Sequence, residues 1–239
     1  MAFNQIKNFV FPNICVCGES VCDSSGFCST CWQQMDFANS NLCDCCGISF
    51  EHSFGAGSLC PECISSTPEF DKARFVFKYN DFAGSLITKF KYSDKTYLSA
   101  LFTEMLSNLI VRNQLGEEFD FITSVPISRK RLFTRKYNQS AILANQLSAK
   151  HNIPVDNQML YRVKNIPPQT TLRRKDRLKN VKNAFHVPKN LKNYIKNSRV
   201  ILVDDVFTTG ATLNECAKTL KANGVKEVFA ITLARTYLT

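Results

Sequence analysis

The sequence predicts an α/β protein in which helices flank a parallel sheet and a small cysteine-rich module comes first. Ten of the eleven cysteines lie between Cys15 and Cys63. Residues 1–70 carry only Lys7 against seven acidic residues, a net charge of −6 in a chain whose total is +10. Beyond that point, strand-like and helix-like apolar patterns alternate, which is typical of a parallel sheet with crossover helices. We therefore expect two domains, at residues 1–70 and 71–239.

Closely spaced cysteines indicate structural zinc sites in the amino-terminal module. Three pairs have a two-residue gap, which lets successive thiolates reach one tetrahedral ion, and a fourth pair has a one-residue gap. No histidine sits within the pairs to suggest an open catalytic position, so we predict two structural zinc ions. Cys22 and Cys45 remain spare candidates. The predicted ligands are Cys15, Cys17, Cys28, Cys31, Cys43, Cys46, Cys60 and Cys63.

The cysteines also indicate a cellular compartment. Grouped cysteines in the reducing cytoplasm bind metal more often than they form disulfides. The apolar stretch at residues 9–11 is far too short for a signal peptide or a membrane span. We expect a cytoplasmic protein without a membrane span.

Apolar periodicity places the strands and helices of the second domain. Phe75, Phe77 and Tyr79 alternate along one face of a strand, and Asp81 is a candidate cap for the helix that follows. Asn223-Gly224 is a typical helix end. The expected elements are a strand at 73–79, helices at 82–91 and 97–111, a short apolar run at 119–126, a helix at 138–150, a strand at 199–203, a helix at 212–222 and a strand at 227–233.

The segment Val200–Thr212 predicts an anion-binding loop. A buried strand delivers two acidic residues to its carboxyl end, where ligands bind in open α/β sheets, and the amides that follow form a cradle at a helix N-terminus. The acidic side chains are expected to accept hydrogen bonds from ribose hydroxyls, directly or through Mg2+. The alternative is an acidic turn leading to a capped helix. The predicted binding residues are Asp204, Asp205, Thr208, Thr209, Gly210, Ala211 and Thr212.

The whole thirteen-residue string resembles the diphosphate-sugar-binding signature of type I phosphoribosyltransferases. The segments Ser124–Ser140 and Pro168–Phe185 are similar to parts of the ComF (ComFC/GntX-like) family of competence-related proteins. The cysteine pairs match that family's double zinc ribbon in order and approximate spacing. The resemblance implies a type I phosphoribosyltransferase-like parallel sheet flanked by helices, with 5-phosphoribosyl 1-diphosphate and Mg2+ as ligands. It also implies a pyrophosphate loop that includes Val125, Pro126, Arg129 and Arg131.

Two departures from the ComF pattern stand out. The family has Arg-Gly-Phe where this chain has Arg135, Lys136 and Tyr137, so a turn that elsewhere uses glycine must tolerate a side chain or change shape. The first cysteine pair of the family has a two-residue gap, whereas Cys15 and Cys17 are separated by one residue. The second departure concerns the geometry of one zinc site.

A strongly basic segment indicates a polyanionic partner. Residues 129–182 contain fourteen Lys and Arg against Asp156 and Asp176, a net charge of +12. Cations that neutralise phosphates, followed by an aromatic residue able to stack on a base, are typical of single-stranded DNA binding. A solvated charged face is the alternative, and the ComF resemblance favours DNA. The predicted DNA-binding residues are Arg129, Lys130, Arg131, Arg135, Lys136, Tyr137, Arg173, Arg174, Lys175 and Arg177.

Three hypotheses about function follow. The first is a ComF-like protein that handles incoming single-stranded DNA during natural transformation, with the sugar diphosphate as ligand or regulator. The second is an active phosphoribosyltransferase of nucleotide salvage, although no segment for recognising a particular base is evident, and binding a donor is not catalysis. The third is an adaptor whose acidic zinc module docks a DNA translocase or another competence protein.

Overall fold

A four-stranded parallel sheet forms the centre of the molecule. The computed structural model describes residues 15–19, 26–38, 41–52, 55–92, 96–163 and 181–237. The strand order is β1-β6-β5-β2, and every pairing is parallel, as the alternating sequence pattern predicts. The strands of this sheet are β1 (Lys72–Lys78), β2 (Phe121–Ser124), β5 (Arg199–Phe207) and β6 (Glu227–Arg235).

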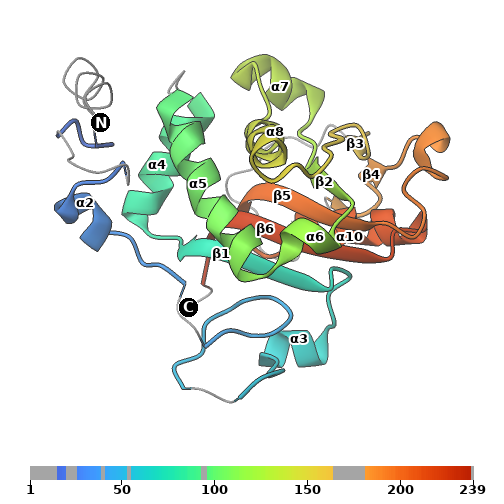
Figure 1. Ribbon diagram of the computed structural model, residues 1–239, viewed down its shortest axis with the longest axis horizontal. Helices are drawn as coiled ribbons and strands as arrows, with labels where there is room; N and C mark the ends of the chain where they lie inside the picture. The colour runs from blue at the N-terminus through green and yellow to red at the C-terminus, as the bar shows by residue number, and fades with distance from the viewer. Residues whose placement is uncertain are drawn as a thin grey trace.

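Helices cover both faces of the sheet (Figure 1). The long helices α4 (Asp81–Tyr92), α5 (Thr96–Arg112) and α8 (Gln139–His151) share one core with β5 and β6. The opposite face is covered by α10 (Ala211–Ala222). The remaining described elements are α2 (Ser29–Gln33), α3 (Pro61–Ser65), α6 (Leu115–Glu118), α7 (Arg129–Arg135), β3 (Tyr161–Arg162), β4 (Phe185–His186) and the 3-10 helix η1 (Lys189–Leu191). None of the helices within the described ranges has the length and apolar character needed to cross a membrane.

The expected elements are present, with differences at their ends. Phe75 and Phe77 are buried as predicted, but Tyr79 follows the end of β1 and is exposed. Asp81 is already the first residue of α4, and the amide of Ala83 donates to Oδ1 of Asn80 at 2.8 Å, so Asn80 caps this helix instead. The cap prediction for Asp81 was therefore wrong by one residue.

Several elements have no counterpart among the expected ones, and two of these additions, α7 and the β3-β4 pair, bear on the site. The basic segment that follows β2 forms the helix α7. Two short strands, β3 and β4, form an antiparallel pair of their own, separate from the main sheet. Helix α10 packs against β4, and Arg162 of β3 interacts electrostatically with Arg131 of α7 and with Asp204 of β5, so these elements adjoin the end of β5.

The amino-terminal module covers the outer edge of β1. Phe37 pairs with Phe77, and the amides of Ala38 and Lys78 reach carbonyls across this edge at 3.0 and 2.6 Å. Farther along, the amide of Ala73 donates to the carbonyl of Cys45 at 2.7 Å. An edge strand otherwise presents unpaired backbone groups. The module is thus joined to the sheet through backbone hydrogen bonds, and the domain boundary at residue 70 stays a prediction.

Candidate anion-binding and metal sites

The turn between β5 and α10 leaves backbone amides at the start of a helix. Gly210 has φ 74° and occupies the cap position of α10 without a side chain to bond the first amides. A Cβ on Gly210 would lie 2.6 Å from Cε2 of Phe207, so the turn needs glycine for both conformation and space. The amide of Ala211 makes only a long 3.4 Å contact with Oγ1 of Thr209. This geometry suits an anion.

Asp204 and Asp205 lie beside this turn, within β5 rather than beyond its end. The strand is longer than expected because β6 continues alongside it, pairing Asp204 with Thr232. Oδ1 of Asp204 accepts hydrogen bonds from Oγ of Ser140 at 3.1 Å and from the amide of Asp205 at 2.9 Å. Oδ2 of Asp205 forms an ion pair of 2.8 Å with Nζ of Lys91.

The two carboxylates differ in their electrostatic environment. Burial raises the pKa of Asp204 to about 7, and the charge of Asp205 adds to the effect. The hydrogen bond from the Asp205 amide, the charge of Lys91 and the hydroxyl of Ser140 all oppose it. Asp204 therefore exchanges a proton near neutral pH, and a ligand that needs its carboxylate must compete with that proton.

Sequence reasoning missed several side chains of this site. Lys91 comes from the last turn of α4 and Ser140 from the first turn of α8. Arg162 belongs to β3, and its guanidinium lies 5.4 Å from the centroid of the Phe185 ring. Burial lowers the pKa of Arg162, and the charge of Arg131 lowers it further, while Cys216 and Asp204 oppose this. Arg162 therefore lies within electrostatic reach of both α7 and the end of β5.

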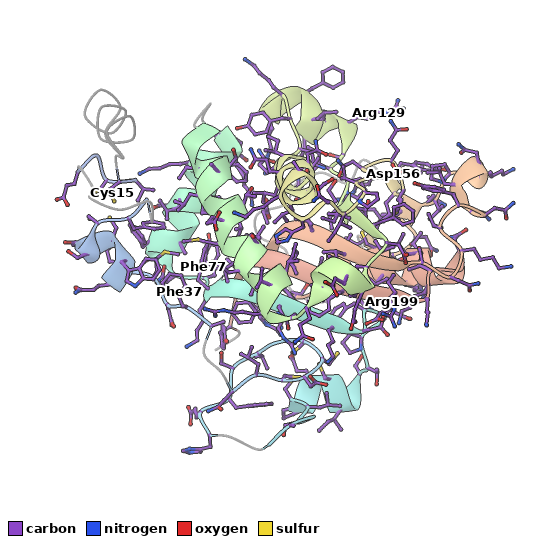
Figure 2. All side chains as sticks on the ribbon, in the orientation of Figure 1. Cys15, Phe37, Phe77, Arg129, Asp156 and Arg199 are labelled. Carbon is purple, nitrogen blue, oxygen red and sulfur yellow. The ribbon has the colours of Figure 1, made fainter. Side chains whose placement is uncertain are left out.

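The predicted pyrophosphate loop follows β2 at the adjoining strand end. The amide of Val125 donates to the carbonyl of Val203 at 2.9 Å, and Nδ2 of Asn138 donates to the carbonyl of Val125 at 3.0 Å. These bonds hold the loop beside β5, next to the predicted anion-binding turn. Ser128 then caps α7 by accepting from the amide of Arg131 at 3.3 Å. Arg129 is exposed on the first turn of α7 (Figure 2).

The helix α7 presents most of its side chains to solvent and buries none of them. The cations Arg129 and Lys130 are exposed, and so are Leu132 and Phe133, the latter at 86%. Lys136 ends the helix with φ 66°, in the left-handed conformation that favours glycine. At the first departure from the family pattern, Lys136 thus adopts, with its side chain, a conformation for which glycine is favoured.

The aromatic side chains near α7 fall into two groups. The hydroxyl of Tyr137 donates to the carbonyl of Phe90 at 3.0 Å, and the residue is partly buried. Tyr92 is 63% exposed, its hydroxyl accepts from Nη2 of Arg135 at 3.3 Å, and the guanidinium lies 5.2 Å from its ring centroid. Tyr92 and Phe133 are thus better exposed for stacking than Tyr137, which the sequence had suggested. The predicted DNA-binding residues Arg173, Arg174, Lys175 and Arg177 lie outside the described residues.

The eight predicted zinc ligands gather into two groups of four. We call Cys15, Cys17, Cys28 and Cys31 the first cluster, and Cys43, Cys46, Cys60 and Cys63 the second cluster. Within each cluster, the sulfur atoms all lie within 4.8 Å of one another. The one-residue gap of the first pair does not prevent convergence. Cys45 belongs to neither group of sulfur atoms, and Cys22 lies outside the described residues.

Both clusters fit a tetrahedral zinc ion. Zn–S bonds of about 2.3 Å imply sulfur atoms about 3.8 Å apart, and the contacts Cys17–Cys28 and Cys46–Cys60 measure 3.7 and 3.6 Å. Backbone amides point at the sulfur atoms, as at Cys15. Burial opposes ionisation of the Cys15 thiol, but hydrogen bonds from the amides of Cys17 and Cys28 lower its pKa to about 7. Amides that favour the thiolate favour the form that binds zinc.

Comparisons with known proteins agree with this division into zinc and sugar-phosphate features. Residues 6–69 match the family model of a double zinc ribbon domain, and residues 138–236 match that of a phosphoribosyl transferase domain. Over 214 residues, the chain is 33% identical to competence protein F of Haemophilus influenzae, covering 88% of this chain and 91% of that protein. The chain belongs to the ComF family. The resemblance inferred from sequence motifs is therefore confirmed, together with the phosphoribosyltransferase-like fold and its zinc-ribbon module.

The ComF chain is also similar to a second curated protein and to a solved structure. It is 30% identical over 214 residues to the DNA utilization protein YhgH of Escherichia coli K12, covering 88% of this chain and 91% of that protein. Among solved structures, a purine phosphoribosyltransferase from Pyrococcus horikoshii matches with a TM-score of 0.34 and 19% identity, covering 57% of this chain and 83% of that chain.

Proposed function

We propose that this ComF protein acts in the cytoplasm during DNA uptake and natural transformation, binding single-stranded DNA and 5-phosphoribosyl 1-diphosphate. The observation that carries the proposal is the adjacency of an anion-binding turn and an exposed basic helix in a relative of competence protein F. Two structural zinc ions and one or more Mg2+ ions are its proposed metals. A DNA translocase or another competence protein is a proposed partner.

The sugar diphosphate would be held from three sides. The amides of residues 208–212 would bind the 5-phosphate, and Asp204 and Asp205 would accept hydrogen bonds from the ribose hydroxyls. The loop at Val125 would face the diphosphate, with Arg131 and Arg162 as neutralising cations. Mg2+ favours carboxylate oxygens, so the acidic pair suits it once the sugar displaces Lys91 from Asp205.

Single-stranded DNA would bind along α7. The exposed cations of this helix would neutralise phosphates, while Phe133 and Tyr92 would offer faces on which bases stack. Leu132 adds apolar surface beside Phe133. Because α7 adjoins the predicted pyrophosphate loop, a bound strand would pass close to the sugar-phosphate site.

Replacing Arg135 and Lys136 by alanine is expected to weaken single-stranded DNA binding and to flatten its dependence on salt. Removing one cation that neutralises a phosphate reduces the slope of log K against log salt by about 0.7, so the double variant should reduce it by about 1.4. Fluorescence anisotropy of a labelled oligonucleotide over a salt series measures both quantities. The variant Lys189→Ala/Lys192→Ala removes the same charge near η1 and serves as the control. An unchanged slope in the α7 variant would exclude this cluster from the DNA site.

Replacing Phe133 by alanine is expected to weaken binding of the same DNA about tenfold without changing the salt slope, because stacking is removed while charge is retained. The side chain is 86% exposed, so thermal stability should not fall. Ile64→Ala, at a side chain that is 69% exposed on α3, is the matched control. Equal affinities for wild type and Phe133→Ala would remove stacking on α7 from the proposal.

An active phosphoribosyltransferase is the second candidate, favoured by the match of residues 138–236 to the phosphoribosyl transferase family. Incubating the protein with Mg2+, the sugar diphosphate and a panel of bases, while following pyrophosphate, separates the two functions. Base-dependent release would establish transfer. Binding of the sugar diphosphate without release, together with DNA binding, would support the first proposal, and failure to bind either ligand would reject it.

A further inference from the structure

The second cluster is connected to the anion-binding turn through one buried cation, the guanidinium of Arg235. Nη1 of Arg235 donates to the carbonyl of Cys46, a residue of this cluster. The side chain of Arg235 leaves the end of β6 and is only 5% exposed. No carboxylate among the described residues forms an ion pair with it, and its Nε has no hydrogen-bond partner there. Its position therefore depends on the Cys46 carbonyl and on its ring contacts.

The same guanidinium supports the turn from the other side. Its Cζ lies 4.1 Å from the centroid of the Phe207 ring, close enough for a cation–π contact. Phe207 also packs edge-on against Phe70, with ring centroids 5.9 Å apart. The Phe207 ring in turn fills the space in which a Gly210 side chain would stand. A continuous set of contacts thus runs from Cys46 through Arg235 and Phe207 to Gly210.

A second connection joins the module to the first turn of α10. The amide of Glu69, six residues after Cys63, donates to Oδ1 of Asn214 at 2.6 Å. Asn214 donates its own amide to the carbonyl of Gly210 at 2.8 Å, as part of the helix start. Both ends of the anion-binding turn are therefore in contact with residues that bond to the second cluster or follow it closely in sequence.

We propose that the second cluster fixes the anion-binding turn through the positioning residue Arg235, so that affinity at the turn depends on zinc in a site that does not touch the ligand. A zinc ion bound by the second cluster would fix the backbone around Cys46, whose carbonyl accepts from Arg235. Without the ion, this backbone would lose its shape, Arg235 would lose the Cys46 carbonyl, and Phe207 would no longer be held against Gly210. The ligand of the turn is the sugar diphosphate of the proposed function, on which this inference rests in part.

Hydrogen exchange of the full chain tests the coupling without a ligand. In the zinc-loaded protein, the amides of residues 214–217, which are hydrogen-bonded in the first turns of α10, should be protected, and Arg235→Met should raise their exchange about tenfold. Arg199→Met, at the opposite end of the sheet, is the control for losing an arginine and should leave this segment unchanged. Cys60→Ser should raise exchange at 214–217, whereas Cys28→Ser in the first cluster should not. Phe207→Leu provides a second variant if Arg235→Met fails to fold.

Measuring the affinity of the protein for the sugar diphosphate distinguishes a failure of the coupling from a failure of the proposed function. Calorimetry with the sugar diphosphate should give a Kd about tenfold higher for Arg235→Met than for wild type, with zinc content equal in the two proteins. Wild-type protein that does not bind the sugar diphosphate would reject the proposed function, while the exchange data would still judge the coupling. Unchanged exchange at 214–217 in zinc-loaded Arg235→Met, or in Phe207→Leu if Arg235→Met does not fold, would overturn the inference.

Discussion

Replacing Asp204 and Asp205 together by alanine is expected to weaken binding of 5-phosphoribosyl 1-diphosphate by more than about 100-fold. Hydrogen bonds to a charged group contribute about 1.5–3 kcal/mol each, and the removal of two such partners exceeds the roughly 2.7 kcal/mol that a 100-fold change requires. Titration calorimetry in the presence of Mg2+ measures the loss of affinity. The variant Glu51→Ala/Glu117→Ala removes two exposed acidic side chains away from the turn and should bind normally.

The fold should survive this double substitution. Burial raises the pKa of Asp204 to about 7, so its charged form opposes folding at higher pH and its removal relieves that cost. Relative to an unfolded pKa near 4, the raised value means that stability increases as pH falls from about 7 toward 4. Removing Asp205 leaves Lys91, at 19% exposure, without its ion-pair partner, which is a modest loss.

The same carboxylate gives the wild-type protein a pH dependence. If the sugar hydroxyls or Mg2+ bind the ionised form, affinity should fall as pH is lowered through about 7, because Asp204 takes up a proton there. Asp204→Asn should bind weakly and lose this dependence. Normal affinity in the double alanine variant, with an intact fold by circular dichroism, would refute the assignment of the turn.

Removing zinc is expected to release about two ions per chain and to unfold mainly residues 1–70. The physical reason is that the described part of the module has only the short helices α2 and α3 and is assembled around the two clusters, while binding free energies at structural zinc sites are of order 10 kcal/mol. Mass spectrometry of metal content before and after a strong chelator gives the stoichiometry, and limited proteolysis locates the unfolded part.

Single cysteine substitutions should show how much of the zinc loss and of the unfolding belongs to each cluster. Cys28→Ser should lose one ion and loosen Phe27 and Met35, which belong to the same buried core as Leu86 of α4. Cys60→Ser should lose the other ion and leave that packing intact. Cys45→Ser should retain both ions, because its sulfur is outside the two groups. A wild-type protein that contains no zinc as purified, and takes none up, would contradict the assignment.

The strands of the main sheet and the cysteine groups could be predicted because each follows from a local pattern. Runs of apolar residues marked β5 and β6, and two-residue gaps marked six of the eight clustered cysteines. Lys91, Ser140 and Arg162 could not be found in this way. They come from three different elements and meet the acidic pair only through the tertiary fold, so no spacing along the chain connects them.

The contrast in charge between residues 1–70 and the rest of the chain is partly explained by ion pairs in the structure. The acidic module suggested a surface for an external partner, yet Asp36 is paired with Lys78 and Asp44 with both Lys72 and Arg74. Those cations all belong to β1. Part of the module's negative charge is therefore complementary to the strand it covers. The sequence contains each charge but does not show which of them face each other.

The amino-terminal module, which covers the outer edge of β1, also affects how the protein would behave during metal shortage. Its hydrogen bonds come from backbone groups at Asp36, Ala38 and Cys45, next to or within the cysteine module. A seven-residue strand whose outer edge is uncovered offers its amides and carbonyls to any neighbouring chain. Newly made protein without zinc would thus tend to associate strand to strand and aggregate. Solubility, measured before any ligand is added, would be the first property to reveal incomplete metal loading.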